Sequence, residues 1–122
     1  MVGALVDADV LIEALRGDRE IPARIDAAAG GGPRLLSVLT AAELRAGASG
    51  DDESVDRLLA DFDPVPLELS TAEHAGRLRR RFGSSHGTDL VDAVLAATAL
   101  DRSVALVTNN RRHFPMPGLT LR

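Results

Sequence analysis

The sequence predicts an α/β fold in which helices cover both faces of a mostly parallel sheet, the three-layer α/β/α arrangement. Short apolar runs alternate with longer stretches of helical periodicity along the whole chain of 122 residues. Each short run is apolar throughout, which is typical of strands that are buried on both faces of a parallel sheet. The length suits one domain, so we expect residues 1–122 to fold as a single unit.

About five short strands are expected, each bounded by turn-forming residues. They are Gly3–Asp7, Arg34–Ser37, Val65–Leu67, Val104–Thr108 and Leu119–Leu121. The helical stretches between them are Val10–Arg16, Ile21–Ala29, Val38–Ala48, Glu53–Phe62, Thr71–Phe82 and Asp89–Asp101. Glycine and proline punctuate the boundaries; the fourth helix stops before Asp63-Pro64 because the residue before proline is pushed out of helical geometry.

Charge is distributed unevenly along the chain, and all 14 basic residues are arginine. Residues 1–73 hold 6 Arg and 15 acids (net −9), whereas residues 74–122 hold 8 Arg and 3 acids (net +5), which gives −4 in total. The acidic total argues against a general nucleic-acid binder, but the split leaves room for one basic surface. The candidates for it are Arg77, Arg79, Arg80, Arg81, Arg111 and Arg112. For Arg79–Arg81 the alternative is the solvated face of a helix.

Composition also excludes several classes of protein. Without cysteine there is no disulfide framework and no thiolate metal site. No apolar run is long enough to span a membrane, and no cleavable leader follows Met1. We therefore expect a cytoplasmic protein that does not enter a membrane.

Three acids interrupt apolar sequence and predict a shared site. Asp7 ends the first strand, Glu43 lies inside an apolar helical stretch, and Asp92 breaks the apolar face of the last helix. An ionised carboxylate is costly to bury alone because it loses its hydration. A divalent cation with oxygen ligands is the simplest partner for three of them. Asn110, which follows the fourth strand, completes the set.

The flanks of Glu43 favour this site over a solvated helix face. Arg45 is expected to cover the solvent side, and the neighbours that leave little polar surface are Leu39, Ala42, Leu44 and Ala46. Two further acids have structural explanations. Asp9 is interpreted as the cap of the first helix, and Asp89 as a first-turn acid favoured by the helix dipole, with Thr88 as the cap.

Four sequence blocks in this order resemble the PIN-domain ribonucleases, specifically the VapC toxins of bacterial toxin–antitoxin pairs. The blocks are Leu5–Ile12, Ser37–Gly47, Ser85–Leu100 and Leu106–Phe114. The resemblance implies that Asp7, Glu43 and Asp92 are the three family acids. Asn110 then takes the fourth position, Asp or Asn in the family, and Thr108 the hydroxyl position. Asp9 and Asn109 depart from the family, which often has Asn or Ser at the first and Arg at the second.

The resemblance further implies a metal-dependent endoribonuclease in which Mg²⁺ or Mn²⁺ activates water for phosphodiester hydrolysis. RNA contacts are expected from Arg79, Arg80, Arg81, Arg111, Arg112 and His86. The implied partners are RNA, a second copy of the chain in a homodimer, and a cognate antitoxin. The helices Val10–Arg16 and Glu53–Phe62 are candidates for the antitoxin contact, and the alternative is that both are ordinary core-facing helices.

Other functions fit less well. The apolar-Asp-x-Asp opening at Asp7 also resembles the phosphohydrolases of the haloacid dehalogenase type, but that chemistry, like that of receiver domains and P-loop proteins, needs a lysine. His74, His86 and His113 have no zinc-ligand spacing, and a metal-free nuclease would use such histidines as acid and base. A degenerate PIN domain that only binds protein is the remaining alternative.

Overall fold

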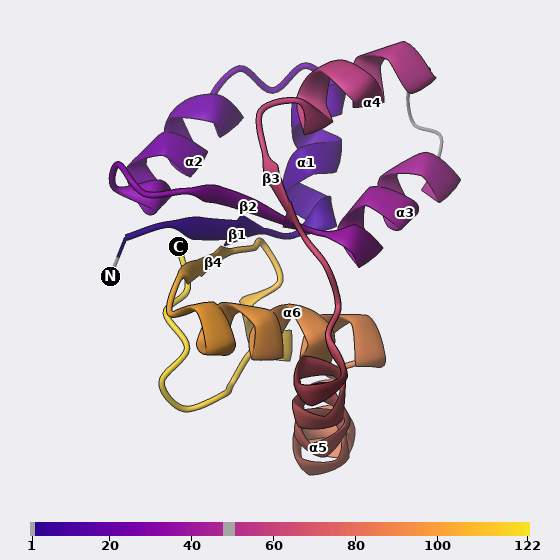
Figure 1. Ribbon diagram of the computed structural model, residues 1–122, viewed down its shortest axis with the longest axis vertical. Coiled ribbons are helices and arrows are strands. Elements are labelled where there is room, and N and C mark those ends of the chain that lie inside the picture. The colour runs from indigo at the N-terminus through magenta and orange to yellow at the C-terminus, as the bar shows by residue number, and fades with distance from the viewer. Residues whose placement is uncertain (1, 48–50) are drawn as a thin grey trace.

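A four-stranded parallel sheet forms the centre of the molecule, and helices cover both of its faces (Figure 1). The computed structural model describes residues 2–47 and 51–122. The strands are β1 (Ala4–Val6), β2 (Arg34–Ser37), β3 (Asp63–Val65) and β4 (Ala105–Val107), in the order β3-β2-β1-β4. The parallel α/β prediction is confirmed.

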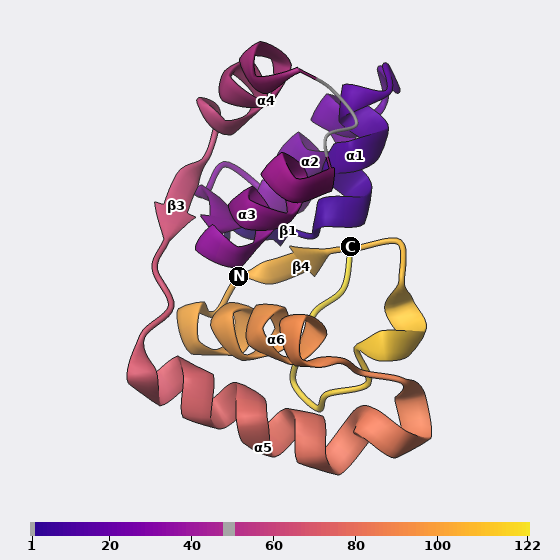
Figure 2. The same ribbon diagram turned by 90° about the vertical axis from the view of Figure 1, so that its right-hand side faces the viewer.

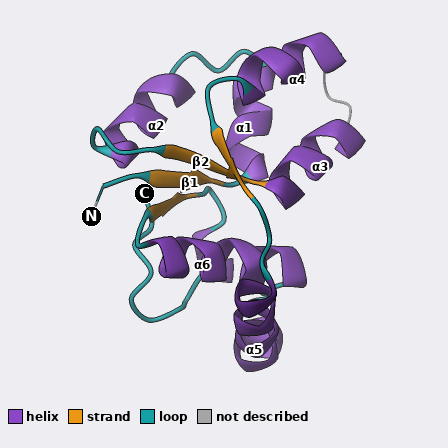
Figure 3. Cartoon of the chain, in the orientation of Figure 1, coloured by secondary structure: helices purple, strands orange, loops and turns teal. Residues whose placement is uncertain are grey.

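The helices divide between the two faces of the sheet (Figure 3). On one face lie α1 (Ala8–Leu15), α2 (Ile21–Ala29), α3 (Val38–Gly47) and α4 (Asp52–Leu59). On the other face α6 (Leu90–Arg102) packs on the sheet, and α5 (Leu69–His86) packs on α6 (Figure 2). Among residues 2–47 and 51–122, no helix has the length and apolarity needed to cross a membrane.

Two apolar cores explain why the strands are apolar at every position. Consecutive side chains of a strand point to opposite faces of the sheet. Leu5 accordingly packs with Leu95 and Leu106 under α6, while its neighbour Val6 packs with Val10 under α1. Both strand residues are fully buried. Burial on both faces therefore produces the continuous apolar runs that predicted the strands.

Two of the predicted strands need correction. The third strand is Asp63–Val65 rather than Val65–Leu67. It lies at the edge of the sheet, where a proline without an N–H is tolerated, and Pro64 pairs in register with Leu36. The predicted fifth strand, Leu119–Leu121, is reduced to a single parallel bridge between Leu121 and Leu106.

Helix boundaries also shift. α1 begins at Ala8, two residues before the predicted start, and α5 continues past Phe82 to His86. It ends at Gly87, whose φ of 68° is the left-handed conformation that glycine adopts readily at a helix end. Ala48, the predicted end of the third helix, lies outside the described residues.

Candidate active site

Asp7 and Thr108 meet where β1 and β4 end side by side. Val6 pairs with Val107, so the next residue of each strand emerges at the same edge of the sheet. The Thr108 hydroxyl donates to Asp7 Oδ2 at 2.9 Å, and the amide of Ala8 donates to Asp7 Oδ1 at 2.7 Å. Asp7, not Asp9, is therefore the N-cap of α1. The prediction that Asp9 caps this helix is wrong, because the helix begins one residue before Asp9.

The carboxyl group of Asp7 lies in an environment that disfavours its charge. Its pKa is raised to about 6 by burial and by the negative charge of Asp9, with a smaller effect of Asp92. The hydrogen bonds from Thr108 and Ala8 act in the opposite direction but do not compensate. Asp7 is thus a buried acid that lacks a positive partner, which is the condition in which a cation is bound most favourably.

Asp92 is held at the start of α6 by a reciprocal pair of hydrogen bonds. The Asp92 amide donates to Asp89 Oδ1 at 2.7 Å, and the Asp89 amide donates to Asp92 Oδ2 at 3.1 Å. This arrangement is a capping box with Asp89 as the N-cap, which corrects the assignment of the cap to Thr88. The Thr88 hydroxyl instead donates to the carbonyl of His113 at 2.7 Å. Burial is the main reason that the pKa of Asp92 is raised.

His113 connects Asp92 to Asn110, a role that the sequence did not indicate. Its Nδ1 lies 3.1 Å from Asp92 Oδ2 and 2.7 Å from Asn110 Nδ2. One ring nitrogen cannot donate to the carboxylate and accept from the amide at once. The backbone N–H of Asn110 donates to Thr108 Oγ1 at 3.0 Å. Asp92, His113, Asn110, Thr108 and Asp7 thus lie in one row of polar contacts, in which His113 Nδ1 bonds to either Asp92 or Asn110 at a time.

Asp9 reaches the same edge from the first turn of α1. Its Oδ2 accepts from the Asn109 amide at 3.1 Å, whereas its Oδ1 is buried and has no hydrogen-bond partner among the described residues. Burial is also the main cause that raises the pKa of Asp9. A buried carboxylate oxygen without a donor is costly, so this atom is available to a ligand.

Arg24 of α2 braces the loop after β4 from outside. Its guanidinium donates to Asn109 Oδ1 at 2.5 Å, to the Thr108 carbonyl at 3.0 Å and to the Arg122 carbonyl at 3.2 Å. Its positive charge opposes the rise in the pKa of Asp9. The sequence offers no signal for this role, because Arg24 is a lone arginine on an amphipathic helix.

Glu43 approaches the acids from α3, but not for the reason that the sequence suggested. Its side chain is exposed, and of its predicted apolar flanks only Leu44 is buried, so the argument from apolar surroundings is wrong. Partial burial nevertheless raises its pKa, followed by the charges of Asp89, Asp92 and Asp9. Glu43 is therefore exposed but near enough to Asp89, Asp92 and Asp9 for their charges to act on it.

Arg45, two residues along α3, does not cover Glu43. It pairs with two acids of α4, Asp52 at 3.0 Å and Asp56 at 2.5 Å. These exposed pairs tie α3 to α4 beside the site.

The donor set suits a hard divalent cation. As the side chains stand, no three acids or histidines in the described ranges lie close enough together to ligate one ion. The groups nevertheless raise one another's pKa, and Asp9 Oδ1 is buried without a donor. Asp7, Asp9, Glu43 and Asp92 offer only oxygen ligands, which Mg²⁺ and Mn²⁺ prefer. A cation would relieve the repulsion among these acids.

The arginines proposed to contact RNA form two separate groups. Arg111 and Arg112 are exposed on the short 3₁₀ turn Arg111–His113, directly after Asn110. Arg79, Arg80 and Arg81 are exposed on α5, the outermost helix. His86, at the end of the same helix, is half-buried, and its Nδ1 lies 2.7 Å from the Ser85 hydroxyl.

The chain matches a known protein family over most of its length. The model of the PIN domain family matches residues 4–117. Ribonuclease VapC10 of Mycobacterium tuberculosis is 41% identical over 119 residues, which cover 92% of this chain and 86% of VapC10.

Solved structures show the same fold. VapBC2 from Rickettsia felis, bound to a DNA fragment from their promoter, superposes with a TM-score of 0.84 at 20% identity over 99% of this chain and 98% of that chain. A toxin–antitoxin complex from Klebsiella pneumoniae gives a TM-score of 0.77 at 28% identity over 96% of this chain and 95% of that chain.

Proposed function

The chain belongs to the PIN-domain family, and from this premise we propose that it is a metal-dependent endoribonuclease that acts as the toxin of a bacterial toxin–antitoxin pair. The main support is the network that runs from Asp7 through Thr108, Asn110 and His113 to Asp92. It gathers buried, mutually repelling acids at the edge where parallel α/β sheets place their sites. The 41% identity to a protein named a ribonuclease supports RNA as the substrate.

Asp7, Glu43 and Asp92 would hold Mg²⁺ or Mn²⁺, and the free Oδ1 of Asp9 is a fourth oxygen within the same cluster. The bound ion would lower the pKa of a water molecule and neutralise charge that builds up on the phosphate. The protein's own residues orient these acids. Thr108 fixes the rotamer of Asp7 through its hydroxyl, and the capping box with Asp89 fixes that of Asp92.

The positive groups around the network suit a phosphate backbone. Arg111 and Arg112 follow Asn110 directly and are exposed, so their guanidinium groups can reach phosphates on either side of the scissile bond. Guanidinium groups bind phosphate oxygens in a bidentate manner. Asn110 is an exposed and uncharged member of the network, so substrate can approach it without repulsion.

An antitoxin and a second copy of the chain are the proposed partners. The Klebsiella pneumoniae structure, at 28% identity, is a toxin–antitoxin complex. Helix α1, which follows Asp7, and helix α4, which packs against α1 and α3, are the proposed antitoxin contact. Exposed apolar side chains support a homodimer; they include Val38, Leu67, Leu69 and Leu90.

The experiment that tests the function compares RNA cleavage by wild type, Asp92→Asn and Asp61→Asn in Mn²⁺. Asp61 is an exposed acid outside the site and serves as the matched control. We expect Asp92→Asn to lose at least about a hundredfold in rate, because one ligand of the cation is gone. Equal rates in Asp92→Asn and wild type would refute the proposal. Calorimetric titration with Mn²⁺ tests the scaffold alternative, which has no need to bind the ion.

A further inference from the structure

A second polar recess lies at the opposite end of α6 from the acidic network. It is a cavity of about 620 Å³ formed by the β3–α5 connection, the first turns of α5 and the last turn of α6. Its charged and hydrogen-bonding lining includes Glu68, Thr71, His74, Arg77, Asp101 and Arg102. Asp92 and Asp101 are separated by two and a half turns of α6, which is about 14 Å along the helix axis. The recess is therefore distinct from the proposed active site.

Asp101 is satisfied by groups within the recess. Thr71 Oγ1 donates to its Oδ2 at 2.9 Å, and His74 Nδ1 lies 3.1 Å from its Oδ1. Both carboxylate oxygens are thus engaged, and the imidazole of His74 is held in a fixed orientation. No described residue hydrogen-bonds to His74 Nε2.

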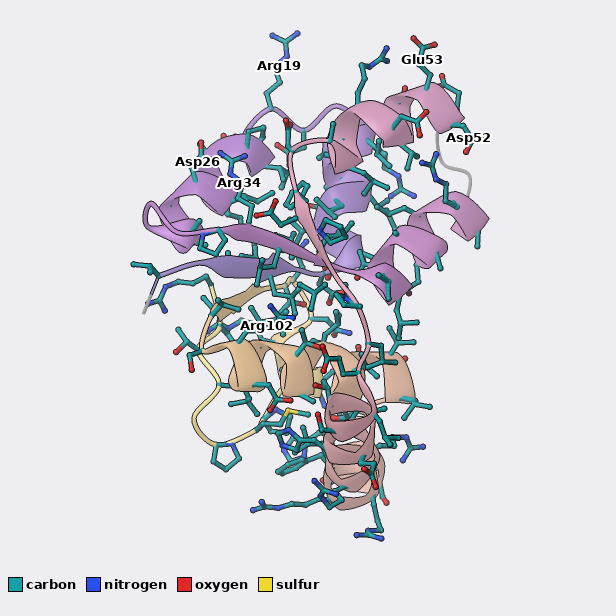
Figure 4. The ribbon with its side chains drawn as sticks, viewed as in Figure 1. Arg19, Asp26, Arg34, Asp52, Glu53 and Arg102 are labelled. Carbon is teal, nitrogen blue, oxygen red and sulfur yellow. The ribbon has the colours of Figure 1, made fainter. Side chains whose placement is uncertain are left out.

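The two arginines of the recess are, by contrast, available. Arg77 and Arg102 line the cavity and are exposed, and within residues 2–47 and 51–122 neither makes an ion pair or a side-chain hydrogen bond. Figure 4 shows Arg102 at the end of α6 beneath the sheet. Glu68 is the one lining acid without such a partner in the described part of the chain, so two free guanidinium groups face one free carboxylate. The lining holds as many acids as arginines, so it is the two unpaired guanidinium groups, not an excess of positive charge, that would bind a phosphodiester anion.

Helix α5 joins this recess to the acidic network. Arg77, Arg80 and Arg81 are spaced three and four residues apart and therefore lie on neighbouring parts of one helix face. Helix α5 ends at His86, and the next residue, Gly87, lies beside His113. A Cβ atom added to Gly87 would be 3.3 Å from His113 Nε2. Arg77 precedes His86 by two and a half helical turns, which is about 14 Å along the axis. A short stretch of single-stranded RNA can span that distance over a basic helix.

We propose that the recess between Arg77 and Arg102 binds a backbone phosphate of the RNA substrate away from the scissile bond, an inference that rests on the proposed ribonuclease function. The two guanidinium groups clamp the phosphate oxygens, which accept hydrogen bonds from both. RNA fits better than a free mononucleotide, because the basic face of α5 continues from the recess toward the active site.

Binding of a fluorescein-labelled single-stranded RNA of mixed sequence, measured by anisotropy in EDTA over a series of salt concentrations, tests the proposal. The variant is Arg77→Ala/Arg102→Ala. The matched control is Arg16→Ala/Arg19→Ala, which removes two exposed arginines between α1 and α2; Figure 4 shows Arg19 on the other side of the sheet from Arg102. We expect about a tenfold loss of affinity and a salt slope smaller by about 0.7, the value for one phosphate of a single strand, in the recess variant alone. Unchanged binding, or an equal loss in both double variants, would overturn the proposal.

Glu68→Gln provides a second test, in which the expected result is tighter RNA binding and misfolding would not produce it. Removing the free carboxylate of the recess should tighten RNA binding, by about threefold, because a repulsive charge is lost. Weaker binding or no change counts against the recess. Sedimentation of Arg77→Ala/Arg102→Ala identifies a different occupant: a change in oligomeric state would make the recess an interface between copies of the chain and overturn the RNA assignment.

Cleavage in Mn²⁺ separates this inference from the proposed function. The recess variant should show a raised KM and an unchanged kcat, since the acids at the other end of α6 are intact. If wild type binds RNA through Arg77 and Arg102 but cleaves none, the ribonuclease proposal fails and the recess stands. If wild type cleaves RNA and the recess variant has the same KM and affinity, only the recess proposal fails.

Discussion

Each end of α6 pairs an aspartate with a histidine in the same way, yet the surroundings are opposite. His113 Nδ1 lies 3.1 Å from Asp92 Oδ2, and His74 Nδ1 lies 3.1 Å from Asp101 Oδ1. Asp92 is buried among other acids, and burial and Asp89 raise its pKa. Asp101 is exposed and lies among a hydroxyl group and two arginines. The same pair of residues thus supports a crowded acidic site at one end and a satisfied surface contact at the other.

The difference indicates which end of α6 lowers the stability of the folded protein. A buried acid with a raised pKa disfavours the folded state at neutral pH, whereas a paired surface acid costs little. Proteins commonly accept such a cost where a site must bind a ligand. Substitutions at the two ends of α6 can show whether folding stability is lowered only at the end that holds Asp92.

The largest expected effect on stability is at Asp7. Its folded pKa of about 6 lies above the 3.8 of an unperturbed aspartate, so the unfolded chain ionises first as pH rises, and stability is lost between about pH 4 and 6. The loss above pH 6 is about 2–3 kcal/mol. Asp7→Asn retains a good helix cap and avoids this loss. We expect equal stability of the two proteins near pH 4 and a more stable variant at pH 7.5, measured by urea unfolding.

Mn²⁺ should reverse that order. An ion that binds only the folded protein stabilises it by mass action, and wild type has the ligand that Asp7→Asn lacks. Thermal unfolding of wild type and Asp7→Asn at pH 7.5, in EDTA and in Mn²⁺, measures the stability of each protein with and without the ion. A wild type that is already the more stable protein in EDTA would show that burial does not penalise Asp7.

The two histidines should differ in their effect on RNA cleavage. His113→Ala frees Asp92 from one of its orienting contacts, and loss of such a contact typically lowers activity by about 10- to 100-fold. His74→Ala removes the corresponding contact at the other end and should leave kcat unchanged. Steady-state kinetics with Mn²⁺ and a short RNA compares them. Equal losses of kcat would abolish the distinction between the two ends.

Whether a site residue could be predicted from the sequence depends on how far apart in the chain its contacts lie. Asp7 and Asp92 could be predicted because each interrupts apolar sequence that must be buried, a property of the local pattern. Arg24 and His113 could not, because their contacts join residues 84 and 21 positions apart. Nothing in the sequence around Arg24 indicates that the chain brings Thr108 beside it.

The fold shows the same division. Strands buried on both faces were predicted correctly at β1, β2 and β4. The predicted range of β3 was wrong because the pairing of this strand begins at Asp63. The backbone of Asp63 pairs with Leu35 although its side chain is exposed. Backbone hydrogen bonds, not apolarity, define that strand. The apolar Leu67, which suggested the strand, is exposed.

Arg24→Ala should have an intermediate effect. The substitution removes three hydrogen bonds from a charged donor and releases the loop that carries Asn109. We expect a loss of about 1–2 kcal/mol in unfolding free energy and a fall in kcat, because the amide of Asn109 also holds Asp9. Arg24→Lys controls for charge and cannot reproduce the fork of contacts. Full activity in Arg24→Ala would show that the brace is structural only.

The smallest predicted effect separates buried polar atoms that are satisfied from those that are not. Thr40 on α3 is fully buried, and its hydroxyl has no partner among the described residues, whereas the Thr98 hydroxyl donates to the Val94 carbonyl at 2.7 Å. Replacing an unpaired hydroxyl with a methyl group of similar shape removes a desolvation penalty. Thr40→Val should therefore be neutral or stabilise the protein by up to about 1 kcal/mol, and Thr98→Val should not. Because Thr40 lies one turn before Glu43, a destabilised Thr40→Val would reveal that its hydroxyl already has a partner, such as an ordered water, next to the acidic cluster.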